Sequence, residues 1–255
     1  MREPARVVLI TGASGDIGRS LARCFAEHGA RLALCDLATS EAAAPLLDEL
    51  AAQDAKAIYR EVDVTAENAI DAFVAEAVRE FGRIDVCLAN AGIVERGPLL
   101  ELTVDAWRRT LEVNLTGGFL TARAAARAMS ADARGGHIVF TGSWVQDQPR
   151  EEIGSYCVSK SGLKMLAKCL ALELAGRNVR VNVVAPGWVD AGLTSKNLAV
   201  NPHLRVEMEN QIPLGRLMPA DEFARAVRLL CSEEASYVTG TTFLVDGGAS
   251  LIRRK

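Results

Sequence analysis

Short, mostly apolar runs alternate along the chain with longer segments in which apolar and polar residues are interspersed. The runs are five or six residues long and occupy residues 6–10, 31–35, 57–62, 84–89, 137–141, 179–184 and 241–245. Such runs are typical of strands that are covered on both faces in a parallel sheet. Their alternation with helical segments predicts an α/β fold with parallel strands and right-handed crossovers.

Between the runs, apolar residues recur three or four positions apart, which indicates amphipathic helices. One predicted helix ends at residue 29. The others occupy residues 41–53, 69–81, 107–129, 156–176 and 219–231. Gly117-Gly118 is expected to interrupt the helix over 107–129. Residues 187–215 are polar and irregular and contain Pro202 and Pro213, which predicts a substrate lid. No linker divides residues 1–255, so we expect one doubly wound domain of about seven strands with helices on both faces.

The bulk composition narrows the class of protein. The chain has 255 residues, of which 49% are hydrophobic and 24% charged, and its net charge is −3. This charge gives no reason to expect a nucleic-acid or membrane-surface partner. No apolar run approaches the ~20 residues that span a bilayer, and no signal-peptide pattern is present. We therefore expect a soluble, cytoplasmic protein.

Cysteine usage agrees with that expectation. No two cysteines form a Cys-x-x-Cys pair, so we expect neither a disulfide framework nor a metal site. Each one lies within an apolar pattern, which is typical of buried thiols in a reducing compartment. They are Cys24, Cys35, Cys87, Cys157, Cys169 and Cys231.

A glycine-rich turn joins the first predicted strand to the first helix. Residues 11–18 read Thr-Gly-Ala-Ser-Gly-Asp-Ile-Gly. Glycines there let the backbone approach a pyrophosphate, and the helix N-terminus offers free N–H groups. The next strand ends at Asp36, 24 residues after Gly12, where a carboxylate can bind the ribose hydroxyls. Because that carboxylate repels a 2′-phosphate, it favours NAD over NADP.

The strand over 137–141 leads into Ser143, and a later helix carries Tyr156 and Lys160 one turn apart. Residues four apart on a helix project side by side, so Ser143 beside this pair makes a small acid–base site. Tyrosine acts as a base near neutral pH only if its pKa falls from about 10 to about 7, a change worth roughly 4 kcal/mol. An ammonium about 4 Å away supplies about that much at an effective dielectric of about 20.

Together these features resemble the short-chain dehydrogenase/reductase (SDR) family over nearly the whole chain. The matching residues are Thr11-Gly12 to Gly18, Asp63, Asn90-Ala91-Gly92, Asn114, Ser143, Tyr156-x-x-x-Lys160, Pro186-Gly187 and Val245-Asp246-Gly247-Gly248. The resemblance implies a Rossmann-like fold and a nicotinamide cofactor. It also implies hydride exchange between an alcohol and a ketone, and a homotetramer.

The resemblance assigns roles residue by residue. Tyr156 is the expected general acid/base, Lys160 is expected to lower its pKa and bond the nicotinamide ribose, and Ser143 is expected to hold the substrate oxygen. Asn114 is expected to support a water relay to Lys160. The expected cofactor-binding residues are Gly12, Ser14, Asp16, Ile17, Gly18, Asp36, Leu37, Asp63, Val64, Asn90, Ala91, Gly92, Tyr156, Lys160, Pro186, Gly187 and Val189.

Two positions depart from the family pattern. Asp16 stands where the family has a glycine, and its carboxylate either weakens cofactor binding or points to solvent. Ala191 stands where the family commonly has a threonine that bonds the nicotinamide carboxamide. Either Thr194 or Ser195 takes over that contact, or the contact is lost.

The expected substrate-binding residues mix aromatic surface with hydrogen-bonding groups. They include Trp144, Gln146, Glu152 and Trp188, and polar groups in a closed site mildly favour a sugar or polyol substrate. The leading prediction is an NAD-dependent oxidoreductase acting on a secondary alcohol or its ketone. The alternatives are an NADPH-dependent 3-oxoacyl reductase and a dinucleotide-binding regulator without chemistry.

Overall fold

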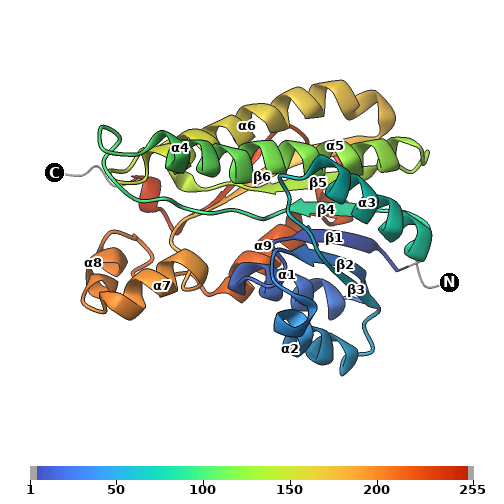
Figure 1. Cartoon of the computed structure of the whole chain (residues 1–255), viewed down its shortest axis with the longest axis horizontal. Helices are drawn as coiled ribbons and strands as arrows, with labels where there is room; N and C mark the ends of the chain where they lie inside the picture. The colour runs from blue at the N-terminus through green and yellow to red at the C-terminus, as the bar shows by residue number, and fades with distance from the viewer. Residues whose placement is uncertain (1–4, 252–255) are drawn as a thin grey trace.

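The structure is a computed structural model that describes residues 5–251, apart from the side chains of residues 193 and 196. Its centre is a sheet of seven parallel strands in the order β3-β2-β1-β4-β5-β6-β7 (Figure 1). The strands are β1 (Val7–Thr11), β2 (Arg31–Asp36), β3 (Ala57–Glu61), β4 (Val86–Ala89), β5 (Gly136–Thr141), β6 (Val179–Pro186) and β7 (Thr242–Val245). The strand order reverses between β1 and β4, where ligands enter open α/β sheets. The predicted doubly wound, Rossmann-like fold is confirmed.

Helices cover both faces of the sheet, and each layer has its own hydrophobic core. One face carries α1 (Asp16–Ala26), α2 (Ser40–Ala51) and α9 (Ala220–Leu230). The other carries α3 (Glu67–Phe81), α5 (Gly117–Ser130) and α6 (Gly154–Leu174), with α4 (Val104–Leu111) packed along α6. The inner strands are buried on both faces, which is why their sequences read as apolar runs, whereas the edge strands β3 and β7 are only partly buried.

Gly117-Gly118 does not interrupt the fourth predicted helix. The chain runs from α4 through a π-helical segment, Glu112–Thr116, directly into α5. A Cβ on Gly117 would lie 2.7 Å from the Val64 side chain, and one on Gly118 would lie 2.9 Å from the Leu163 side chain. The two glycines therefore serve close packing inside a helix that continues past them.

Residues 187–215 are more regular than the sequence predicts. They contain α7 (Gly192–Val200) and α8 (Leu204–Asn210), which stand off to one side of the sheet in Figure 1. A small apolar cluster formed by Leu198, Ile212, Leu217 and Ala249 holds them against the end of the chain. The sequence did not predict these helices, because the segment is polar and contains two prolines, and because each helix is only about two turns long with a narrow apolar face.

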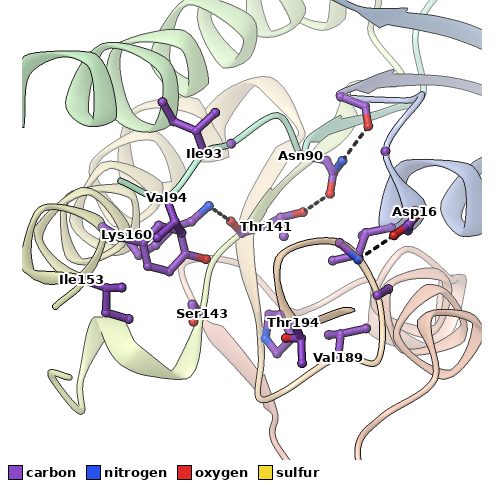
Figure 2. A pocket seen from close by; sticks show the side chains of 18 of the residues that line it. Asp16, Asn90, Ile93, Val94, Thr141, Ser143, Ile153, Lys160, Val189 and Thr194 are labelled. Carbon is purple, nitrogen blue, oxygen red and sulfur yellow. Dashed lines mark hydrogen bonds between the residues drawn. The ribbon is translucent and has the colours of Figure 1, made fainter. Parts of the chain in front are cut away.

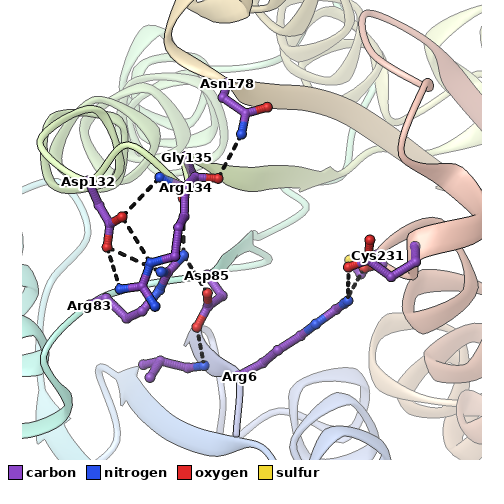
Figure 3. Close-up of polar contacts among 10 residues, drawn as sticks. Arg6, Arg83, Asp85, Asp132, Arg134, Gly135, Asn178 and Cys231 are labelled. Carbon is purple, nitrogen blue, oxygen red and sulfur yellow. Dashed lines mark hydrogen bonds and ion pairs between the residues drawn. The ribbon is translucent and has the colours of Figure 1, made fainter. Parts of the chain in front are cut away.

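The amino ends of the strands are joined by charged side chains (Figure 3). Arg6 donates to the carbonyl of Cys231 at 2.6 Å, and Asp85 accepts from the backbone N–H of Val7 at 2.8 Å. Arg83 forms an ion pair with Asp85 at 2.6 Å. This network lies at the amino ends of the strands, opposite the carboxyl ends. It therefore supports the fold and does not contribute residues to a ligand site at the carboxyl ends.

All six cysteines are unpaired, and five of them are buried as predicted. Cys169 is exposed on α6, so its predicted burial is wrong. It shares an outward face with Met165 and Leu172, which look like core positions in the sequence. Among the described residues, no group of His, Cys, Asp and Glu side chains could hold a metal ion, and no helix is long and apolar enough to cross a membrane.

Candidate active site

A cavity of about 870 Å³ opens at the carboxyl ends of the strands. It runs from the glycine turn, past the ends of β4 and β5, to Trp144 and to residues of α7 and α8. Every residue predicted to bind the cofactor lines it, and so do three of the four predicted catalytic residues: Ser143, Tyr156 and Lys160. Asn114 is not among the lining residues. The topology thus gathers residues from six separate strand ends into one cavity.

The glycine turn fits a dinucleotide pyrophosphate. Gly12 has a φ of +66°, and a Cβ there would lie 2.8 Å from the Cα of Ala91. A Cβ on Gly18 would lie 2.1 Å from the carbonyl oxygen of Gly12. Helix α1 begins directly after the turn, with no side chain capping its N-terminus. Its free N–H groups and partial positive charge therefore suit an anionic phosphate.

Asp36 fixes one wall of this end of the cavity. Its Oδ2 accepts from the backbone N–H of Ser14 at 2.9 Å. Tyr59 braces the same wall, because its hydroxyl donates to the carbonyl of Ala38 at 2.6 Å and lies 3.1 Å from the hydroxyl of Ser14. The sequence interpretation missed Tyr59, whose position in an apolar strand indicates only core packing. The carboxylate of Asp36 is therefore held in place at the cavity wall, and its contact with ribose hydroxyls stays a prediction.

Asn90 ties three strand ends together (Figure 2). Its amide Nδ2 donates to the carbonyls of Thr11 at 3.1 Å and Gly12 at 3.2 Å, and its Oδ1 accepts from the hydroxyl of Thr141 at 3.1 Å. These bonds hold β1, β4 and β5 in register at the cavity floor. Thr141 lines the cavity as well, although nothing in its sequence position sets it apart from other strand residues.

Tyr156 lies at the inner end of the cavity beside Ser143. Burial raises the pKa of Tyr156 to about 12, while a hydrogen bond with Ser143 acts in the opposite direction. The sequence predicts that Lys160 lowers this pKa, and the structure shows no such fall. The phenol therefore keeps its proton at neutral pH in this state of the protein.

The position of Lys160 explains why the pKa of Tyr156 does not fall as predicted. Its ammonium donates to the carbonyl of Thr141 at 2.6 Å (Figure 2) and lies 5.4 Å from the centre of the Tyr156 ring. Lys160 is itself 3% exposed, and burial lowers its pKa to about 8. The ammonium faces a carbonyl and an aromatic ring, while the desolvation of the phenol works against the phenolate.

Asn114 is buried within the π-helical segment and does not face solvent. Its Nδ2 donates to the carbonyl of Ile93 at 2.9 Å and to the hydroxyl of Ser159 at 3.0 Å, and its Oδ1 accepts from the backbone N–H of Ile93 at 2.8 Å. The widened helical turn brings the amide within reach of the β4 loop, as π-bulges often do at functional sites. The water relay to Lys160 stays a prediction.

The two departures from the family pattern are placed by the structure. Asp16 Oδ2 accepts from the backbone N–H of Gly192 at 2.7 Å, which joins the glycine turn to the first residue of α7 (Figure 2). Ala191 and Thr194 both line the cavity. Ser195 does not line it, and its hydroxyl contacts Asp190 at 3.5 Å. Thr194 therefore lines the cavity and Ser195 does not, and a contact of Thr194 with the nicotinamide carboxamide stays a prediction.

The substrate end is formed by two tryptophans. The rings of Trp144 and Trp188 lie 4.8 Å apart at an angle of 58°, and they pack with Tyr156 and Ile153. Gln146 does not take part: it is buried away from the cavity, and its amide reaches the hydroxyl of Thr242 at 3.5 Å. Its predicted role toward substrate is therefore wrong, because the short 3-10 helix after Ser143 turns this side chain under the sheet edge.

Fold and cavity together define a dinucleotide-binding α/β oxidoreductase, and comparison with known proteins gives the family. A family model described as enoyl-(acyl carrier protein) reductase matches residues 12–250. The chain is 38% identical over 248 residues to a cis-4-hydroxycyclohexanecarboxylate dehydrogenase of Sinomonas cyclohexanicum, covering 97% of each chain. It is 34% identical over 252 residues to the 3-oxoacyl-(acyl-carrier-protein) reductase FabG of Escherichia coli, covering 99% of this chain and 100% of FabG.

Solved structures agree with this result. A short-chain type dehydrogenase/reductase from Mycobacterium marinum superposes with a TM-score of 0.89 at 34% identity, covering 96% of this chain and 95% of that one. An NAD+-bound xylitol dehydrogenase superposes with a TM-score of 0.92 at 29% identity, covering 97% and 100%. The chain belongs to the short-chain dehydrogenase/reductase family, and it is an oxidoreductase acting on the CH–OH group of donors.

Proposed function

We propose that this protein is an NAD-dependent dehydrogenase that exchanges a hydride between a secondary alcohol and the corresponding ketone. One observation carries the proposal. Ser143, Tyr156 and Lys160 meet at the inner end of a cavity whose other end holds the glycine turn and Asp36. A dinucleotide lying between those ends would bring its reactive ring to the acid–base residues.

The residues divide the chemistry between them. When bound, the nicotinamide ring accepts the hydride from the alcohol carbon or returns it to the ketone carbon. Ser143 holds the substrate oxygen, and Tyr156 exchanges the hydroxyl proton with that oxygen. Because burial keeps the Tyr156 phenol protonated at neutral pH, the side chain stands ready as an acid for ketone reduction. In alcohol oxidation, Tyr156 must first release its own proton, and the Ser143 hydrogen bond favours the resulting phenolate, which then accepts the hydroxyl proton.

The preference for NAD rests on Asp36 and its surroundings. Among the described lining residues, the cationic side chains are Arg96, Arg150 and Lys160, and none of them lies at the Asp36 end. A 2′-phosphate there would face the Asp36 carboxylate, and the nearby guanidinium of Arg19 does not line the cavity and donates to the carbonyl of Ser14 at 2.8 Å. The similar xylitol dehydrogenase was crystallised with NAD+ bound, which supports the same preference.

The similarity to FabG favours one competing function, an NADPH-dependent 3-oxoacyl reductase. Steady-state turnover with each cofactor separates the two. The substrates would be cyclohexanol, xylitol and 4-hydroxycyclohexanecarboxylate for oxidation, and a 3-oxoacyl thioester for reduction. We expect kcat/KM to favour NAD by about tenfold or more, because a carboxylate facing the 2′-phosphate discriminates against NADP. A preference for NADPH with the thioester as best substrate would overturn the proposal.

The substrates after which similar proteins are named share a hydroxyl or oxo group on carbon: hydroxycyclohexanecarboxylate, xylitol, 3-oxoacyl and 3β-hydroxysteroid. This range supports a secondary alcohol as the reacting group. The mild preference for a sugar or polyol loses one of its reasons, because Gln146 lies outside the cavity. Xylitol stays in the substrate panel as the direct test of that preference.

We also propose that the chain assembles as a homotetramer in the cytoplasm. Exposed apolar residues recur along the outer face of α6 at Val158, Met165 and Leu172. A residue every seven positions returns to the same helix face, which suits packing against another helix. Unpaired thiols suit a reducing compartment. The mass of the assembly in solution tests the first of these proposals.

A further inference from the structure

The hydroxyl of Tyr59 has its proton committed to one partner. Tyr59 lies on the edge strand β3 and is 5% exposed. Its hydroxyl donates to the carbonyl of Ala38 at 2.6 Å, just after the end of β2. Burial raises the pKa of Tyr59, while a hydrogen bond with Ser14 acts in the opposite direction, so the phenol is protonated at neutral pH. A phenol carries a single proton and a carbonyl can only accept. The proton of Tyr59 therefore points at Ala38.

The direction of a second hydrogen bond follows from the first. The hydroxyl oxygen of Ser14 lies 3.1 Å from that of Tyr59. Because the proton of Tyr59 is already used, Ser14 donates in this bond and the phenolic oxygen accepts. Within residues 5–251, the Ser14 hydroxyl forms no other hydrogen bond, so lone pairs of its oxygen remain open to a ligand. Ser14 lines the cavity, and its hydroxyl therefore meets a ligand as an acceptor.

The backbone of Ser14 is fixed on both sides of the residue. Its N–H donates to Oδ2 of Asp36 at 2.9 Å, and its carbonyl accepts from Nε of Arg19 at 2.8 Å. Arg19 is not among the residues that line the cavity. These two bonds place the residue, and the bond to Tyr59 sets the direction of its hydroxyl proton.

Asp36 adds a charged acceptor to the same wall. Its Oδ1 accepts only from the N–H of Ala38 at 3.4 Å, and its Oδ2 accepts from the N–H of Ser14. An ionised carboxylate has about four lone-pair sites, so both oxygens can accept further hydrogen bonds. The Ser14 hydroxyl and the Asp36 carboxylate thus present acceptors to the cavity. A ligand that carries hydroxyl groups can donate to both of them.

We propose that Tyr59 is a positioning residue for cofactor selectivity: it commits the Ser14 proton, so that the Ser14 oxygen accepts from the adenosine ribose of NAD. A 2′-phosphate brings negative charge and acceptor oxygens, so it cannot satisfy a wall of acceptors. The direction of the Ser14 proton therefore adds to the effect of the Asp36 charge. This inference rests on the proposed NAD-dependent function and names a second determinant of its cofactor.

Equilibrium binding of NAD and NADP tests the proposal without turnover. Tyr59→Phe keeps the buried ring and removes the hydroxyl, which frees the Ser14 proton to point into the cavity. NAD then loses an oriented acceptor, and NADP gains a donor. The ratio of the NADP to the NAD dissociation constant, measured by isothermal titration, should fall by about fivefold or more, as expected for one hydrogen bond. Tyr237→Phe removes the hydroxyl of an exposed tyrosine and, as the matched control, should leave the ratio unchanged.

The Ser14→Ala background separates a role through Ser14 from a structural role. There, Tyr59→Phe should change the ratio by less than about twofold, because the hydroxyl that Tyr59 orients is absent. A change as large as the one in the wild-type background would show that Tyr59 acts through the packing of β3, and would overturn the proposal. A ratio that Tyr59→Phe leaves unchanged in the wild-type background would overturn it as well.

Turnover distinguishes this inference from the proposed function. With the best alcohol, Tyr59→Phe should raise the KM for NAD by about threefold or more and change kcat by less than about twofold, because the adenosine end lies away from the reacting carbon. A lower kcat with an unchanged KM would contradict the assigned role and leave the dehydrogenase function intact. Absence of NAD-dependent turnover with every substrate, together with the expected fall in the binding ratio, would refute the function and support the role of Tyr59.

Discussion

His137 lies on β5 with its imidazole enclosed in the sheet, 3% exposed. Its Nε2 lies 2.8 Å from the amide Nδ2 of Asn182, which can only donate, so the imidazole accepts at that atom. Nδ1 is buried without a hydrogen-bond partner in the described part of the chain. Burial, together with the positive charge of Arg180, holds the pKa of His137 well below its usual value. The folded protein therefore keeps this side chain neutral.

This burial makes stability depend on pH. The unfolded chain takes up a proton at His137 below about pH 6.5, and the folded chain does not, so stability falls as pH drops by up to about 1.4 kcal/mol per pH unit. Thermal unfolding of the wild type and of His137→Gln between pH 7.5 and 5.5 measures the effect. The variant should be less stable at pH 7.5 and lose less stability on acidification.

His203→Gln is the control for this comparison, because His203 is exposed on the lid. It should reproduce the wild-type dependence on pH. If His137→Gln and the wild type lose stability equally between pH 7.5 and 5.5, the burial of His137 is not the source of the pH dependence of stability.

The residue scale also shows where sequence reasoning succeeded. Spacing alone brought Tyr156 and Lys160 onto one helix face, since a helical period is fixed by backbone geometry. The direction of the Tyr156 pKa was not accessible in this way. It depends on how much water the fold excludes and on whether Lys160 faces the phenol oxygen or the carbonyl of Thr141. Both are properties of three-dimensional packing.

At the scale of elements, the contact between Asp16 and Gly192 couples α1 to α7. The carboxylate accepts from the first N–H of α7, so it satisfies a donor that has no partner within the helix. The same carboxylate sits in the turn that would hold the pyrophosphate. Asp16 therefore stabilises α7 against the glycine turn while adding negative charge next to the N-terminus of α1.

Asp16→Asn and Asp16→Gly separate these two effects. The asparagine retains an oxygen acceptor for Gly192 and removes the charge, which is worth on the order of 1 kcal/mol near a protein surface. NAD should then bind about fivefold more tightly by isothermal titration. The glycine removes the acceptor as well, so hydrogen exchange at α7 should become faster while it stays unchanged in the asparagine variant.

Glu27→Gln, at the other end of α1, is the charge-matched control and should leave both measurements unchanged. Weaker NAD binding by Asp16→Asn would contradict the assigned electrostatic effect. Equal exchange rates at α7 in the glycine variant and the wild type would contradict the lid contact.

Elements with strong periodic patterns were predictable, and those shaped by tertiary contacts were not. The seven strands followed from apolar runs because both sheet faces are covered. The sequence did not predict α7 and α8, because each helix is short and packs only a few apolar residues. The π-helical turn at Asn114 likewise exists because that amide bonds to Ile93 and Ser159, which are distant in sequence.

At the scale of the whole molecule, the outer face of α6 is too apolar for a surface that meets only water. Met165 is 60% exposed and Leu172 is 83% exposed. If this face joins copies of the chain, a charge at its centre must be desolvated on assembly and will disrupt it. Met165→Glu should therefore lower the mass measured by light scattering, where the wild type is expected as a tetramer.

Leu229→Glu places the same charge at an exposed apolar position on α9. It serves as the control and should leave the wild-type mass unchanged. A wild type that is monomeric at micromolar concentration would contradict the proposed assembly.

The most direct test of the account follows the hydride and the proton together. The best alcohol of the substrate panel, deuterated at its carbinol carbon, would be incubated with NAD and either the wild type or Tyr156→Phe. The wild type should form NADH that carries the deuterium. Tyr156→Phe should form it at least about 100-fold more slowly, because it lacks the acid–base group, while its NAD dissociation constant changes less than about threefold. Unlabelled NADH, or a Tyr156→Phe rate close to that of the wild type, would contradict the central claim.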